Sequence, residues 1–180
     1  MPRRCSHRPR TWLSLAALCL CAVCATASTA GAQPGTADPP KPLPEEIVQV
    51  WTKAGARVGW MGVDKFGQLS FADKMDGSTG AVPAFRFDAW QDGQLAGLPV
   101  PAAVFGLDLN NTQVTDAGLK ELAGLQSLQT LVLFGTQVTD AGLKELAGLK
   151  SLRELWLGDT QVTDAGVAQL RQALPNCRIW

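Results

Sequence analysis

"TQVTDAGLKELAGL" occupies residues Thr112–Leu125 and recurs letter for letter at Thr136–Leu149, 24 residues later. Its first seven letters return at Thr160–Gly166, again after 24 residues. A fixed period of this length indicates a chain of similar structural units, each packed against the next. This period sets where the individual helices and strands are expected.

Apolar residues spaced two apart follow the same period. They are Leu107 and Leu109, Leu131 and Leu133, Leu155 and Leu157, a degenerate earlier copy at Phe85 and Phe87, and a terminal fragment at Ile179–Trp180. Alternate side chains of an extended chain point to opposite faces. Each pair thus predicts a short strand with its apolar residues in the core and the residue between them pointing outward.

A short helix is predicted after each strand. Thr115, Thr139 and Thr163 precede an apolar pattern at helical spacing and suit helix N-caps. The aspartate after each threonine lies in the first turn, where the helix dipole favours negative charge. Apolar residues are expected to face inward at Leu119, Leu122, Leu143, Leu146, Val167 and Leu170, and close packing between units is expected at Gly118, Gly142 and Gly166. Exposed positions such as Gln113, Lys120 and Glu121 are expected to be free of packing.

The pattern L-x-x-L-x-L-x-x-T-x-V, as in "LQTLVLFGTQV" and "LRELWLGDTQV", resembles the leucine-rich repeat. Thr112, Thr136 and Thr160 stand where the family usually has Asn or Cys. "VTDAGLKEL" is similar to the helix of the cysteine-containing, RNI-like subclass, found in F-box adaptors and many bacterial proteins. The resemblance implies an α/β solenoid of a bacterial exported protein, with short parallel strands on the concave face and helices on the convex face.

Residues 1–32 have the order of a secretory signal peptide: four arginines in the first ten residues, the apolar stretch Trp12–Ala27, then Ala30-Gly31-Ala32. An exported protein (secreted, periplasmic or in the cell envelope) without a stable membrane span is therefore expected. The alternatives are an uncleaved anchor and lipidation of a cysteine in the apolar stretch. Residues 33–44 contain five prolines and predict an extended linker.

Residues 45–84 match no repeat and predict a small α/β N-terminal cap. A helix from Glu45 should end at Gly55, and a hairpin should turn at Asp64–Gly67. The helix should place on one face the residues Ile47, Val48, Val50, Trp51 and Ala54. The segment "DKMDGSTGAVP", Asp73–Pro83, is expected to be a loop. The repeats are then assigned to residues 85–106, 107–130, 131–154 and 155–178, followed by 179–180.

Composition argues against several classes of function. Residues 33–180 carry twelve Lys and Arg against sixteen Asp and Glu, a net charge of −4 that disfavours nucleic acid and anionic lipid. The same residues contain no His and no Tyr, and their one cysteine, Cys177, cannot form an internal disulfide. The spacing of Asp73 and Asp76 does not fit a calcium loop. No metal, cofactor or enzymatic activity is expected; a hydrolase using carboxylates such as Asp73 is a minor alternative.

The two nearly identical units differ at their strands. The outward positions change from Thr130, Val132 and Phe134 to Glu154, Trp156 and Gly158, while the leucines are retained. Strands line the concave surface of a solenoid, where partners usually bind. The candidate ligand-binding residues are Arg86, Asp108, Asn110, Val132, Phe134, Glu154 and Trp156.

The sequence thus predicts a non-catalytic binding scaffold that recognises a protein, a peptide or a glycan. Two alternatives stay open. The exposed aromatic residues could merely cover one another, with Trp180 continuing the row of Trp156 or closing the end of the core. The unpaired strand around Arg178–Ile179 could also pair with another copy, which would make the chain a structural or self-associating envelope protein.

Overall fold

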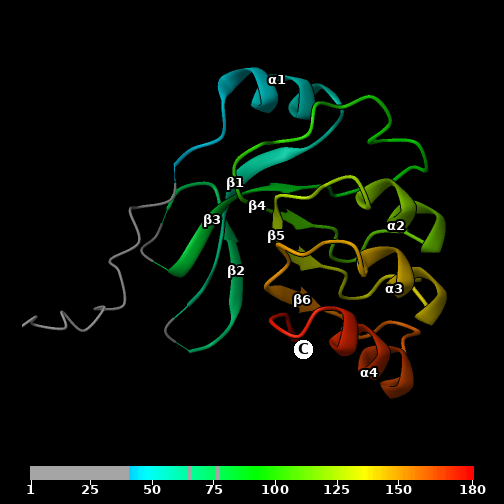
Figure 1. Ribbon diagram of the computed structural model, residues 1–180. Helices are drawn as coiled ribbons and strands as arrows, with labels where there is room; N and C mark the ends of the chain where they lie inside the picture. Colours follow the sequence, from blue (N-terminus) through cyan, green and yellow to red (C-terminus); the bar gives the residue numbers. More distant parts are fainter. Residues whose placement is uncertain (1–40, 65, 76–77) are drawn as a thin grey trace, which may run out of the picture. The chain divides into compact units, whose positions relative to one another are not determined.

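The computed structural model describes residues 41–180, except residues 65 and 76–77 (Figure 1). The predicted signal peptide, residues 1–32, and most of the predicted linker lie outside the described residues. Within the described part, no helix is long and apolar enough to span a bilayer.

Helices and strands alternate along a single seven-stranded sheet with the order β2-β1-β3-β4-β5-β6-β7. Strands β3 to β7 are parallel to one another, whereas β1 pairs antiparallel with β2 and β3. The elements are α1 (Glu45–Lys53), β1 (Arg57–Val63), β2 (Leu69–Ala72), β3 (Thr79–Arg86), β4 (Phe105–Asp108), α2 (Asp116–Leu122), β5 (Leu128–Val132), α3 (Asp140–Leu146), β6 (Glu154–Trp156), α4 (Asp164–Ala173) and β7 (Arg178–Ile179). This agrees with the predicted α/β class.

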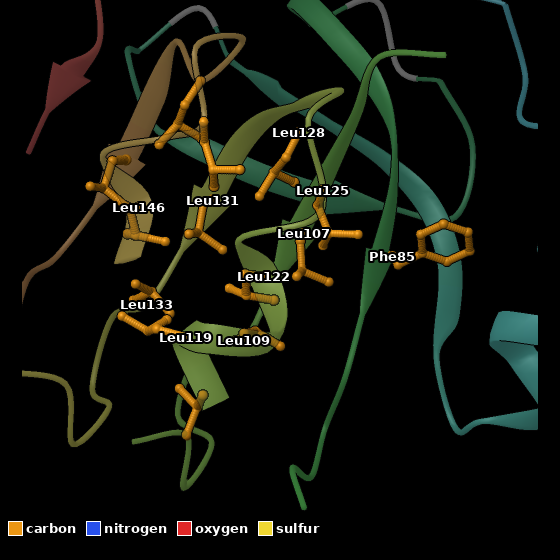
Figure 2. Packing of buried hydrophobic residues seen from close by; sticks show 14 of the residues in the cluster. Phe85, Leu107, Leu109, Leu119, Leu122, Leu125, Leu128, Leu131, Leu133 and Leu146 are labelled. Carbon is orange, nitrogen blue, oxygen red and sulfur yellow. The ribbon is translucent and has the colours of Figure 1, made fainter. Parts of the chain in front are cut away.

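The sequence period is the register of the parallel strands. Phe85 pairs with Leu107, which pairs with Leu131, then Leu155, then Ile179. The first four of these side chains are fully buried. They meet helix residues such as Leu119 and Leu122 in one continuous core, which Figure 2 shows in close-up. The predicted inward direction of the strand leucines is confirmed.

Each helix begins at the predicted threonine. Thr115 and Thr139 accept hydrogen bonds from the backbone N–H groups two residues on, and Thr163 accepts one from Gly166. Before each helix, a second threonine closes the turn: the Thr136 hydroxyl donates to the Leu133 carbonyl at 2.6 Å, with counterparts at Thr112 and Thr160. The threonines therefore define both the turn and the helix start.

The first-turn aspartates also join neighbouring repeats, a role that the sequence analysis missed. Asp116 Oδ1 accepts the Thr139 N–H at 2.8 Å, and Asp116 Oδ2 accepts the Thr139 hydroxyl at 2.6 Å. Asp140 makes the same two bonds to Thr163. The hydrogen bond from the Thr163 hydroxyl is the main cause that lowers the pKa of Asp140 below its ordinary value of 3.8. Each aspartate thus fixes the start of the next helix.

The helix glycines allow this close approach, as predicted. A Cβ atom on Gly118 would lie 2.6 Å from Val114 Cγ2 and 2.8 Å from Trp90 Nε1. On Gly142 it would collide with the Asp116 carboxylate. Neither position has space for a side chain.

Helix α1 covers the N-terminal end of this core. Trp51 stacks on Phe85 with ring centroids 4.3 Å apart, and its indole N–H donates to the Pro99 carbonyl at 2.9 Å. The helix ends before Gly55, at φ +97°, as predicted. Two expectations are wrong here. Val50 is 37% exposed because it points away from the Trp51 face, and Leu43, assigned to the linker, is buried in the core.

The predicted hairpin is confirmed. Asp64 and Gln68 close its turn through a backbone hydrogen bond of 2.8 Å, and Gly67 lies at φ +80°. The predicted loop Asp73–Pro83 is wrong from residue 79 onward, because Thr79–Pro83 belong to β3 and pair with β1. Pro83 is tolerated because β4 begins to pair with β3 only at Ala84.

Residues 87–104, in the unit before the first good repeat, form turns in place of a helix. Glu121 of α2 holds these turns: its carboxylate accepts the N–H groups of Gly93 at 2.5 Å and Leu95 at 3.0 Å. The expectation that Glu121 is free of packing is therefore wrong.

Candidate functional site

The residues between the core positions form a second row across the sheet. Arg86 pairs with Asp108, Asp108 with Val132, and Val132 with Trp156. Because side chains alternate along a strand, this row lies on the face opposite the leucines and their helices. We call this face the open face. In Figure 1, α2, α3 and α4 follow one another along the other side of the strands.

The β1–β2 hairpin folds over part of the open face. Leu69 and Phe71 of β2 pack against a cluster formed by Met61, Ala84 and Val132, as does Trp156. Strands that are well separated in the sheet order are thus brought together by the curl of the sheet. A pocket of about 350 Å³ lies between hairpin and open face. We call it the open-face pocket.

Six of the seven candidate residues line the open-face pocket; they are Arg86, Asp108, Asn110, Val132, Phe134 and Trp156. The seventh, Glu154, is half-buried and is not among the lining residues. Its carboxylate lies toward the C-terminal end of the core, where it adds to the effect of burial on Cys177. Burial and Glu154 together raise the pKa of that thiol to about 11. Cys177 is therefore a core residue and a poor nucleophile at neutral pH.

The half-buried Arg86 and the buried Asp108 lie side by side in the lining of the pocket. Arg86 Nε lies 3.2 Å from Asp88 Oδ1 and 3.7 Å from Asp108 Oδ2, and its guanidinium group sits 5.9 Å from the Phe71 ring centroid. Asp108 is only 5% exposed. Burial raises the pKa of Asp108 above 3.8, although the Asn110 N–H and the Arg86 charge act in the opposite direction.

Asn110 and Phe134 lie just beyond the ends of their strands. The Asn110 backbone N–H donates to Asp108 Oδ1 at 2.9 Å. Phe134 is 44% exposed and leans over Gly158, where an added Cβ would come within 2.8 Å of the phenyl ring. The smaller residue in the next repeat thus makes room for the phenyl ring.

Trp156 stacks on Trp180, with ring centroids 5.2 Å apart and ring planes 20° apart. Trp180 is 58% exposed, so it extends the row of Trp156 and does not close the end of the core. The stacking partner of Trp156 is thus Trp180.

Three buried side-chain polar atoms of the pocket have no hydrogen-bond partner within the described residues; they are Arg86 Nε, Asn110 Oδ1 and Trp156 Nε1. Arg86 Nε is within ion-pair distance of two carboxylates. This leaves one acceptor, on Asn110, and one donor, on Trp156, without a polar partner. Buried polar groups of native proteins are nearly always paired, so both atoms point to a ligand or to water.

A family model described as "Leucine Rich repeat" matches residues 107–123 and 124–147. Residues 107–147 of the chain are therefore leucine-rich repeats. Proteins with these repeats are generally protein-interaction scaffolds and typically non-catalytic, because their stacked units present one extended surface. No match to the chain is found among curated proteins.

Other sites considered from the sequence gain little support from this leucine-rich repeat structure. Asp73 pairs with Arg57 at 3.5 Å on an exposed surface, and Asp76 lies outside the described residues. Among the residues described, no group of three or more His, Cys, Asp or Glu could hold a metal ion.

Sequence reasoning missed the hairpin side of the pocket, which consists of Met61 and residues 67–71. The hairpin itself was predicted, but its position over the open face depends on contacts between strands far apart in the sequence.

Proposed function

We propose that this leucine-rich repeat protein is a non-catalytic binding protein that recognises a partner protein or peptide through the open-face pocket. The pocket would lie on the concave strand face of a short solenoid of the RNI-like subclass. The observation that carries the proposal is the convergence of Arg86, Asp108, Asn110, Val132, Phe134 and Trp156 on one pocket. The sequence predicts all six as outward-facing positions at the strands.

The size of the pocket favours a small recognition element. A volume of about 350 Å³ is at the lower end of the range for ligand pockets, roughly 300–1,000 Å³. A partner would therefore insert a short segment there, with further contacts over Phe134 and the hairpin. A glycan is a second kind of ligand compatible with this size.

The N-terminal sequence supports a proposal for the compartment in which the protein binds its partner. The arginines, the apolar stretch and the small residues of the first 32 positions support export from a bacterial cell, so the partner would be extracellular, periplasmic or in the envelope. Recognition by the exported protein would require no cofactor.

A capture experiment from the extracellular or envelope fraction tests the proposal. The baits are the wild-type protein, a double variant with Phe134→Ala and Trp156→Ala, and a control variant with Lys120→Ala on the exposed side of α2. Circular dichroism and urea unfolding first establish that all three are folded. A partner held by the wild type and by Lys120→Ala, but lost from the double variant, supports recognition through the pocket. Equal capture by all three baits contradicts it.

A second candidate function is self-association. It is favoured by β7, which is the last strand of the sheet and is paired on one side only within the described chain, and by the exposed Trp180 beside it. Molar mass would then rise with protein concentration in light scattering, and deletion of residues 178–180 would abolish the increase. A monomer at all concentrations would exclude this function.

A further inference from the structure

The hairpin supplies a strand edge to the open-face pocket. Strand β2 is the first strand of the sheet, and β1 is its one neighbour in the described chain. Residues 67 and 68 of the turn and Leu69, Ser70 and Phe71 of β2 line the pocket, so the pocket follows three of the four residues of this strand. In an antiparallel pair, alternate residues direct their N–H and C=O groups away from the partner strand. The edge of β2 therefore offers backbone donors and acceptors in a row.

The opposite wall offers two further polar atoms. Trp156 Nε1 is a buried donor and Asn110 Oδ1 a buried acceptor, and both lack a hydrogen-bond partner. A ligand that satisfies both must present an acceptor and a donor within one pocket. The peptide group does so, since its carbonyl accepts and its N–H donates.

The charges of the pocket favour an uncharged ligand. Arg86 is within ion-pair distance of both Asp88 and Asp108, so its positive charge is already offset by carboxylates and attracts an anion only weakly. A cation would meet the Arg86 guanidinium beside the Asp108 carboxylate. A neutral amide needs only hydrogen bonds, so its binding carries no free-energy cost of burying an unpaired charge.

The aromatic rings favour a peptide over a sugar. Sugars stack on free ring faces, but Trp156 is stacked on Trp180 and packed against the hairpin cluster. The Arg86 guanidinium group lies over the Phe71 ring, 5.9 Å from its centroid. Of the three rings lining the pocket, Phe134 is the one that is exposed.

We infer that the pocket binds an extended, uncharged segment of a partner polypeptide, which adds to the edge of β2 as a further strand and hydrogen-bonds to Trp156 Nε1 and Asn110 Oδ1. This inference rests on the proposed function and specifies its ligand. Addition of a strand to a sheet edge is a general mode of peptide recognition, in which the backbone supplies affinity and pockets select side chains.

The test uses the full mature protein and a library of N-acetylated, C-amidated heptapeptides with uncharged central residues. Binding is measured by tryptophan fluorescence and confirmed by calorimetry. Library members are expected to bind with dissociation constants below about 1 mM. Trp156→Phe keeps an aromatic ring but removes the indole donor, so it should weaken binding about tenfold, the effect of losing one hydrogen bond.

Trp90→Phe is the matched control. Trp90 Nε1 is likewise buried without a partner, but it lies against Gly118, outside the pocket. Its substitution should leave peptide affinity unchanged. Equal losses in the two variants would overturn the inference.

A second comparison isolates the backbone. Two versions of one bound peptide are N-methylated on alternate amides, in the two possible registers. Since a strand pairs through one edge only, methylation in one register should abolish binding and in the other should preserve it. Equal binding of both versions overturns strand addition, as does the absence of any bound library member.

Neutral oligosaccharides form the last arm of the experiment. If these bind and the peptides do not, the peptide inference is wrong. The proposed function would still hold if Phe134→Ala with Trp156→Ala abolished capture of the natural partner. Failure of that capture test would instead remove the proposed function itself.

Discussion

At the scale of single residues, the aspartate in the first helical turn shows which contacts a local sequence pattern predicts and which it does not. The sequence predicts that Asp116 and Asp140 act on the helix dipole, because their own helix lies beside them. Their hydrogen bonds to Thr139 and Thr163 join residues 23 positions apart, so no local pattern indicates them. The repeated interval does contain the information, once the units are known to stack in register.

Gly142→Ala should destabilise the protein by about 1–3 kcal/mol, the usual cost of inserting a methyl group into a packed site. The new Cβ would displace the Asp116 carboxylate from Thr139. Gly148→Ala is the control, because a Cβ there has open space and no unusual backbone angle. Urea unfolding measures both. Equal effects of the two substitutions would contradict the close packing between repeats.

Asp140→Asn should change how stability depends on pH. The pKa of Asp140 is lowered in the folded state, chiefly by the Thr163 hydroxyl, so its contribution is present above pH 3.8 and is lost as the pH falls below that value. Wild type should exceed the variant in urea midpoint at pH 7, and the difference should shrink in acid. A constant difference would show that ionisation of Asp140 does not matter.

Asp108→Asn should show the opposite trend. Burial raises the folded-state pKa of Asp108, so the protein is favoured with this group protonated and loses stability as the pH rises from 3.8 through the raised pKa. The asparagine can still accept the Asn110 N–H. The variant is therefore expected to be at least as stable as wild type at pH 7. A lower urea midpoint at pH 7 would mean that the ion pair with Arg86 outweighs burial.

At the scale of elements, the repeats could be predicted because period, strand alternation and threonine caps all agree. The strands, helices and register from Phe85 to Ile179 follow from this agreement. The loop predicted at Asp73–Pro83 is wrong from Thr79 onward. Its glycine and proline residues favour a loop, whereas in the structure Thr79–Pro83 pair with β1, a tertiary contact that the local sequence does not indicate. Residues 87–104 form no helix because this degenerate unit keeps the strand pattern of Phe85 and Phe87 but has no copy of the segment TDAG that begins each later helix.

Thr139→Ala should destabilise the protein more than Thr115→Ala. Both lose an N-cap bond, worth about 1 kcal/mol. Thr139 also loses its hydroxyl bond to Asp116, which adds about 1 kcal/mol. Thermal and urea unfolding of the two variants gives the comparison. If Thr115→Ala cost as much as Thr139→Ala, the bond between repeats would contribute nothing.

At the scale of the whole described chain, sequence patterns identified one wall of the pocket but not the other. The outward row of Arg86, Asp108, Val132 and Trp156 follows from alternation along strands of known register. The curl of the sheet, which brings residues 67–71 over that row, depends on the packing of Leu69 and Phe71 against distant strands. Such contacts have no counterpart in a single sequence.

The most direct test of recognition through the open-face pocket is hydrogen exchange of the protein with and without its captured partner. If the partner binds in the open-face pocket, exchange should slow in β2 and around Asn110 and Phe134 and stay unchanged in α2, α3 and α4. Protection confined to those helices, or to β7, would contradict it and move the binding surface away from the pocket.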